Sequence, residues 1–138
     1  MSTDRSQDET GNAMGSDTLA AELVRYAFDK KAQDVIELDL RGIVDYTDRF
    51  VIVTGRSDRQ VKAIADGIVR GLKKEHGLNP RRVEGLPEAK WVLVDCWDVV
   101  VHVFQPDARD LYRLEKLWSD APKIEHAEPA ADVSGSQG

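Results

Sequence analysis

A short apolar run followed at once by a long amphipathic segment restricts the fold of this chain more than any other feature. Residues 50–54 read Phe-Val-Ile-Val-Thr, which is typical of a strand buried on both faces. Residues 57–60 read Ser-Asp-Arg-Gln, the capping-box pattern with which helices often begin, and Gly77 suits the left-handed residue that ends one. A stripe at helical spacing joins these signals and predicts a helix packed on a buried sheet: Val61, Ile64, Ala65, Ile68, Val69 and Leu72.

The remaining segments extend this unit into a single α/β (α+β) domain. A first helix is predicted from an N-cap at Asp17 toward Lys31. Pro106 suits the first turn of a last helix, whose apolar side consists of Leu111, Leu114, Leu117 and Trp118. Strands are predicted at residues 34–39, 50–54, 81–84, 91–95 and 99–104, the last two forming a hairpin. The order αββαβββα indicates a mixed β-sheet packed with helices.

The formal net charge of −6 lies mostly at the two ends of the chain. Residues 1–16 carry −2 and residues 119–138 carry −3, so the middle lacks the excess of Lys and Arg that a general DNA-binding surface needs. Both ends are poor in large apolar residues, which favours disorder. We therefore expect a disordered tail at 1–16, a domain at 17–121 and a disordered acidic tail at 122–138, with both tails dispensable for binding.

Three features favour a cytoplasmic protein. No apolar run approaches the roughly 20 residues that a membrane-spanning helix needs. The first residues are polar and acidic, without the apolar stretch of a secretory signal. Cys96 is the only cysteine, so an intrachain disulfide and a cysteine metal cluster are excluded. A reducing compartment and no membrane partner fit these features.

An enzymatic function is the alternative that the sequence leaves open. Gly55–Ser57 lies at a strand-to-helix junction, where free amides can hold a phosphate. The GxxxxGK[ST] and GxGxxG patterns are absent, however, and a turn plus a helix cap explains the same residues. Two acidic pairs, Asp45 with Asp48 and Asp95 with Asp98, could hold a divalent cation, but each is short of a ligand set and Asp is common in turns. The alternative is a nucleotidyltransferase-like enzyme that binds a nucleotide.

His102 and the polar side of the long helix each allow two interpretations. His102 lies amid apolar strand residues, on the face opposite to Val101 and Val103. Without a nearby nucleophile or second His, a structural role is favoured over a catalytic one. Five basic residues give the helix either a solvated face or an RNA contact, although no aromatic platform accompanies them: Arg59, Lys62, Arg70, Lys73 and Lys74.

Trp91 is the most informative bulky residue. In a strand it shares a face with Leu93 and Asp95, while Val92 and Val94 take the other face. If the two valines pack inward, Trp91 and Leu93 are left toward solvent or a partner, and Trp is a common interface anchor. The pattern leaves a core role and an interface role equally open.

Several segments, taken together, resemble one family. They are Asp45–Val61, Ala63–Asp66, Glu84-Gly85 with Trp91–Asp95, Asp98–Phe104 and Arg109–Trp118. In this order and spacing they are similar to the ribosomal silencing factor (RsfS, or Iojap) family over roughly residues 18–121. Many family members place Gly where this chain has Trp97.

The resemblance implies a nucleotidyltransferase-like topology without the catalytic motif, no cofactor or metal, and no enzymatic activity. It implies binding to the large ribosomal subunit through uL14, the large-subunit ribosomal protein numbered fourteen. Bound there, such a factor blocks subunit association by steric exclusion and represses translation when nutrients are scarce. Peripheral rRNA contact and a homodimer of the free protein stay open. The partner-binding residues, with Leu93 added from the strand pattern, are Glu84, Trp91, Leu93, Asp95, Asp98 and His102.

Overall fold

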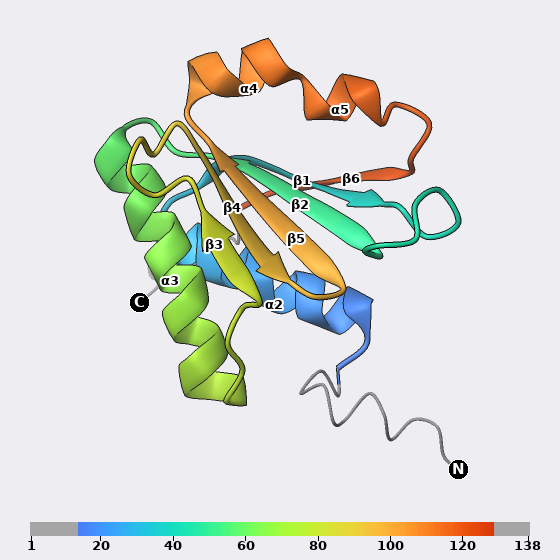
Figure 1. The fold of residues 1–138 in the computed structure, drawn as a ribbon, viewed down its shortest axis with the longest axis horizontal. Coiled ribbons are helices and arrows are strands. Elements are labelled where there is room, and N and C mark those ends of the chain that lie inside the picture. The colour runs from blue at the N-terminus through green and yellow to red at the C-terminus, as the bar shows by residue number, and fades with distance from the viewer. Residues whose placement is uncertain (1–13, 129–138) are drawn as a thin grey trace, which may run out of the picture.

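The computed structural model describes residues 14–128, which form a six-stranded sheet between two unequal helical layers (Figure 1). Helices α2 and α3 pack on one face, and the short helices α4 and α5 lie across the other. None of the helices in residues 14–128 is long and apolar enough to span a bilayer. The elements are α2 (Ser16–Asp29), β1 (Gln33–Asp39), β2 (Arg49–Thr54), α3 (Asp58–His76), β3 (Arg82–Glu84), β4 (Trp91–Cys96), β5 (Val99–Phe104), α4 (Pro106–Tyr112), α5 (Leu114–Leu117) and β6 (Lys123–His126).

The strand order is β3-β4-β5-β2-β1-β6. Strands β2 and β5 run parallel, and every other neighbouring pair is antiparallel. This confirms the predicted mixed sheet. All residues of β2 and β5 are buried, because these strands hold the centre of the sheet and helices cover both faces there. Their β-branched and aromatic side chains suit such a position.

Side chains alternate between two separate apolar cores. The core facing α2 and α3 takes one set of alternate strand residues, including Val51, Val53, Val92, Val94, Val101 and Val103. The core facing α4 and α5 takes the other set, including Ile36, Leu38, Phe50, Ile52, Val100 and Phe104. Val92 and Val94 are fully buried against the helices, so the predicted inward face of β4 is confirmed.

Helix α3 begins and ends where the sequence predicts. The Ser57 hydroxyl accepts the backbone N–H of Gln60 at 3.1 Å, and Gly77 has a left-handed φ of 66°. The predicted stripe packs on the sheet, with Val69 only partly buried. Helix α2 begins at Ser16 with Gly15 as its N-cap, so the prediction of Asp17 as the cap is wrong. Asp17 lies in the first turn instead, where a negative charge still suits the helix dipole.

The prediction of one continuous amphipathic last helix is wrong, because the structure has two short helices there. Arg113 has a φ of 48° and separates α4 from α5. Leu114 is buried, whereas Leu111 and Leu117 are 72% and 68% exposed. The three leucines share a side only in an unbroken helix, and a left-handed residue between the first two redirects the following turn.

The ordered chain extends past the predicted domain boundary at residue 121. Lys123–His126 forms β6 and pairs with β1, which corrects the expectation of disorder for this part of residues 122–138. An edge strand can be held mainly by backbone hydrogen bonds, so its low apolar content is a poor guide to its order. The predicted tails otherwise fall largely on residues 1–13 and 129–138, outside the described residues.

Ending the chain after residue 121 is expected to lower the free energy of unfolding by at least about 1 kcal/mol, since it removes the hydrogen bonds between β6 and β1. Ending it after residue 128 keeps β6 and is expected to leave stability unchanged. Urea unfolding of both shortened chains beside the full chain measures the difference. Equal stability of the two shortened chains would show that β6 contributes nothing.

Candidate partner-binding face

Three neighbouring strands bring most of the predicted site residues to one face of the sheet. Glu84, Leu93 and His102 form a cross-strand row through β3, β4 and β5. Trp91 and Asp95 lie on the same face of β4, because side chains alternate along a strand. This is the face that α4 and α5 cover only in part, and Trp91 and Leu93 are half-buried there. Asp98 instead lies in the turn between β4 and β5.

A hollow of about 270 Å³ opens on the uncovered part of this face. Apolar and aromatic groups form its interior, and charged groups lie among them. The lining residues are Tyr46, Phe50, Arg81, Arg82, Leu93, Asp95, Val100 and His102. Tyr46 is 62% exposed, so a large aromatic side chain already stands in solvent beside the hollow. Below, "the hollow" means this cavity.

Trp91 and His102 are joined by a hydrogen bond. The Trp91 indole N–H donates to His102 Nδ1 at 3.0 Å. The Trp91 ring stacks on Phe104 at 5.0 Å and meets Tyr112 of α4 at 4.6 Å between centroids. Part of the Trp91 ring therefore packs in the core, as one interpretation of its pattern predicts, and the rest stays exposed and available to a partner.

Burial lowers the pKa of His102 to about 3, so the imidazole is neutral near pH 7. The side chain is on the face opposite to Val101 and Val103, as predicted. His102 lines the hollow but belongs to no group of three possible metal ligands among residues 14–128. These surroundings favour packing and hydrogen bonding over proton transfer.

Charges of both signs surround the hollow, whereas the charged residues of the predicted site are all acidic. Asp95 accepts the Trp97 backbone N–H at 3.0 Å, and its other oxygen lies 3.5 Å from Arg82 Nε and 3.8 Å from Arg81 Nε. Glu84 is exposed and lies 3.6 Å from Arg82. The two arginines, which the sequence analysis does not single out, therefore offset much of the acidic charge.

The β4–β5 turn explains the acidic pair Asp95 and Asp98. Cys96 pairs with Val99, so Trp97 and Asp98 form a two-residue turn, and Trp97 has a φ of 71°. Such turns need positive φ, which Gly adopts most readily. Burial, and secondarily Asp48, raise the pKa of the Asp98 carboxyl. The geometry supports the turn interpretation of this pair.

At the candidate phosphate site, Gly55–Ser57, two backbone amides donate to the protein's own groups. The Gly55 N–H donates to the Phe104 carbonyl at 2.9 Å, and the Arg56 N–H donates to Gln60 Oε1 at 2.7 Å. The Gln60 N–H in turn donates to Ser57. Because the Gly55 and Arg56 amides already have acceptors, the turn-and-cap interpretation is favoured over a phosphate site.

One group of possible metal ligands occurs within residues 14–128: Glu22, Glu75 and His76. Arg25 Nη2 lies 2.8 Å from Glu22 and 2.5 Å from Glu75. Hydrogen bonds from Arg25 and His76 lower the pKa of Glu22 to about 2. A metal ion would compete with this guanidinium, so the group is best described as an ion-pair link between α2 and α3.

Cys96 and the basic side of α3 are two further candidates. Burial raises the pKa of the Cys96 thiol to about 12, which makes it a poor nucleophile. The basic residues of α3 are exposed, and Arg70 pairs with Asp66 at 2.8 Å. The α3 surface is thus compatible with either a solvated face or an RNA contact.

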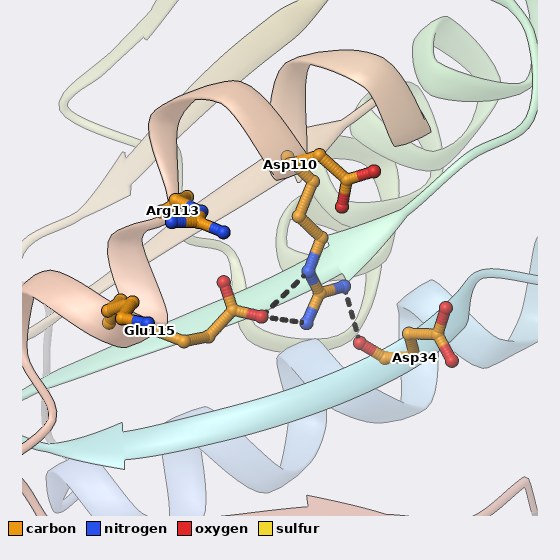
Figure 2. Close-up of a pocket in the computed structure, with 6 residues that line it drawn as sticks. Asp34, Asp110, Arg113 and Glu115 are labelled. Carbon is orange, nitrogen blue, oxygen red and sulfur yellow. Dashed lines mark hydrogen bonds and ion pairs between the residues drawn. The ribbon is translucent and has the colours of Figure 1, made fainter.

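Arg109 holds the α4–α5 segment against the sheet, a role that the sequence does not reveal. Its guanidinium bonds to the Glu115 carboxylate at 2.8 and 2.9 Å, to the Asp34 carbonyl at 2.6 Å and to the Thr54 hydroxyl at 2.7 Å. In Figure 2, dashed lines that mark these bonds end at Glu115 on one side and at Asp34 on the other. Both residues, with Asp110 and Arg113, line a pocket of about 360 Å³. By fixing α4, these bonds help keep Tyr112 on Trp91.

The fold and this face together define the class of protein: an α+β domain with helices on both faces of its sheet, one face being only partly covered. The Gly55 and Arg56 amides donate to other groups of the protein, the Glu22, Glu75 and His76 group is paired with Arg25, and the Cys96 thiol is buried. The half-covered face, in contrast, offers aromatic surface, a hollow and charges of both signs. Partner-binding surfaces often combine these features.

Comparison with known proteins identifies the family. The family described as ribosomal silencing factor during starvation matches residues 13–137. The chain is 52% identical to the ribosomal silencing factor RsfS of Bacillus subtilis over 94 residues, or 68% of this chain and 79% of that protein. It is 48% identical to that of Halalkalibacterium halodurans over 97 residues, covering 70% and 82%. A crystal structure of a Chromobacterium violaceum protein aligns with a TM-score of 0.74 at 40% identity, covering 77% and 88%. The chain belongs to the ribosomal silencing factor family, which confirms the resemblance.

Proposed function

We propose that this protein binds the large ribosomal subunit through uL14 and prevents the small subunit from joining. The half-covered face with Trp91, Leu93 and the hollow is the observation that carries the proposal. Membership of the ribosomal silencing factor family supports it. The protein acts by occupying a surface, in the cytoplasm and without cofactor, metal or catalysis.

The face combines apolar area with charged groups at its periphery, as protein-binding surfaces often do. Leu93 and the exposed part of Trp91 supply apolar area whose burial drives association. Glu84 and Asp98 offer acidic groups at the periphery, while Arg81 and Arg82 offer basic ones. Matched charges on the partner would set orientation and selectivity more than affinity.

Steric exclusion follows if the docking position on the large subunit overlaps the surface that meets the small subunit. Translation would then fall in proportion to the fraction of large subunits occupied, which suits a response to nutrient scarcity. The exposed basic side of α3 could add a peripheral rRNA contact. A homodimer of the free protein would compete for the same face only if the two surfaces overlap.

Trp91→Ala and Leu93→Ala are expected to weaken binding to isolated large subunits. Truncating an interface Trp typically costs about 2 kcal/mol or more, roughly a 30-fold rise in Kd, and Leu93→Ala should have a smaller effect in the same direction. Trp91→Ala should also lower thermal stability, because its ring packs on Phe104 and Tyr112. Cosedimentation and a Kd for purified uL14 measure the effect.

Val101→Ala is the matched control, since Val101 is fully buried on the opposite face. It should lose stability yet keep its affinity at a temperature where it stays folded. Wild-type binding to small subunits as strong as to large ones, or unchanged affinity in both face variants, would rule out the proposal.

A further inference from the structure

His102 carries a buried N–H group that finds no acceptor in the part of the chain that the structure describes. Among residues 14–128, its Nε2 is a fully covered side-chain atom without a hydrogen-bond partner. Nδ1 accepts the Trp91 indole N–H, and an indole nitrogen can only donate. The proton of the neutral imidazole must therefore be on Nε2. Trp91 thus fixes the tautomer and makes Nε2 a donor.

The rings around this N–H group offer it no strong hydrogen-bond acceptor. The Phe50 ring meets the His102 ring at 4.5 Å and an interplanar angle of 70°, a geometry that at best provides a weak contact with a ring face. Phe104 lies 6.2 Å away and nearly parallel. Buried donors without an acceptor are rare in native proteins. An acceptor supplied by a bound partner would give the N–H group its missing hydrogen bond.

The hollow determines what kind of acceptor can enter. Phe50, Leu93 and Val100 line it beside His102, and charged side chains line the rest. The Phe50 ring packs directly against the imidazole, so a group that reaches the imidazole exchanges water for apolar contacts there. A carboxylate would lose its hydration there at a large penalty, whereas a hydroxyl or an amide carbonyl loses far less. Arg81 and Arg82 also line the hollow, but both already face the Asp95 carboxylate, which would repel a second carboxylate.

We infer that the partner inserts a neutral hydrogen-bond acceptor, a Ser or Thr hydroxyl or a backbone carbonyl, into the hollow, where it accepts the Nε2–H of His102. This inference rests on the proposed function and places the acceptor on the docking surface of uL14. The lining side chains must shift to uncover Nε2, and rotamer changes of this kind are common at interfaces. Tyr46, the most exposed of the lining aromatic residues, is the natural one to move.

The donor would act as a specificity element. A surface with an apolar group at this position would leave the N–H buried and unsatisfied. Sites built to hydrogen-bond one group reject an otherwise similar partner that lacks it. His102 would thus select the partner, while Trp91 and Leu93 supply most of the buried area.

Two amide substitutions separate the nitrogens of His102. His102→Asn places an oxygen near the position of Nδ1, so it can accept from Trp91 but loses the donor. His102→Gln places its amide nitrogen near the position of Nε2, so it keeps a donor. Affinity for large subunits is expected to fall at least about tenfold in the Asn variant and clearly less in the Gln variant. Equal affinity of the Asn variant and the wild type would overturn the inference.

A measurement on the wild-type protein tests whether the His102 Nε2–H gains an acceptor on binding, even if a variant does not fold. Side-chain ¹⁵N NMR of His102, with and without purified uL14, should show the Nε2-protonated tautomer in both states. The proton resonance should move to the position of a hydrogen-bonded N–H on binding. Failure of the wild type to bind large subunits would refute the proposed function itself. Binding without a change at Nε2 would refute only the inference about His102.

Discussion

Arg49→Met is expected to lower the free energy of unfolding by about 3–5 kcal/mol. Arg49 and Glu37 are both buried on the face that α2 covers, and Arg49 Nη1 lies 3.1 Å from Glu37 Oε2. Arg49 Nε also donates to the Ser16 hydroxyl at 3.1 Å. Glu37 Oε1 lies 2.9 Å from His126 of β6. Removing the guanidinium would leave a buried carboxylate without its main counter-charge, which is far more harmful than losing an exposed ion pair.

Replacing both partners separates the buried charge from the loss of packing. The double variant Glu37→Met with Arg49→Met removes the pair together, and it is expected to be much more stable than Arg49→Met alone. Urea unfolding of the wild type, both single variants and the double variant gives the coupling energy directly. A loss below about 1 kcal/mol in Arg49→Met, or additive losses in the double variant, would contradict a buried ion pair.

Acid is expected to destabilise the domain through His102. Burial lowers its folded-state pKa to about 3 from an ordinary 6.5. Between these values the unfolded chain binds one more proton than the folded chain. Stability is therefore lost as the pH falls below about 6.5, at a rate approaching 1.4 kcal/mol per pH unit, and the loss levels off near pH 3.

His102→Gln removes this titration while keeping the rest of the chain. The difference in unfolding free energy between wild type and variant should shift in favour of the variant from pH 6.5 to pH 4, by about 2–3 kcal/mol. Because the carboxylates are the same in both proteins, their contributions to the pH dependence largely cancel in this difference. A difference that stays constant over this pH range would show that His102 is not held neutral by burial.

The elements with strong local signals could be predicted from the sequence. The capped helix α3 and the apolar strands β2, β4 and β5 each contain their own pattern, so their type needed no knowledge of neighbours. The α4–α5 break and β6 could not be read in this way. The first depends on a left-handed Arg113, a conformation that no residue type other than Gly signals well. The second depends on pairing with β1, about 85 residues earlier in the chain.

Strand alternation predicted which residues share the candidate face, but not which of them contact one another. Alternation placed Trp91, Leu93 and Asp95 together, and the resemblance added Glu84 and His102. The bond between Trp91 and His102 and the ion pairs of Asp95 depend on cross-strand register, which one sequence does not specify. One signal for the Arg49–Glu37 pair was present: Glu37 shares an inward face with Val35. A single charge in an apolar pattern does not, however, identify its partner.

Sheet closure must wait until nearly the whole chain has been synthesised. Strand β2 can pair early with β1, but its other neighbour is β5, with Phe50 opposite Val100, and β1 pairs on its outer side with β6. Two strands alone are at best marginally stable in water, and pairings this distant in sequence form slowly. The valine-rich surfaces of the first half therefore stay exposed on the growing chain. The sheet of this member of the ribosomal silencing factor family therefore closes only as the last strand leaves the ribosome that made it.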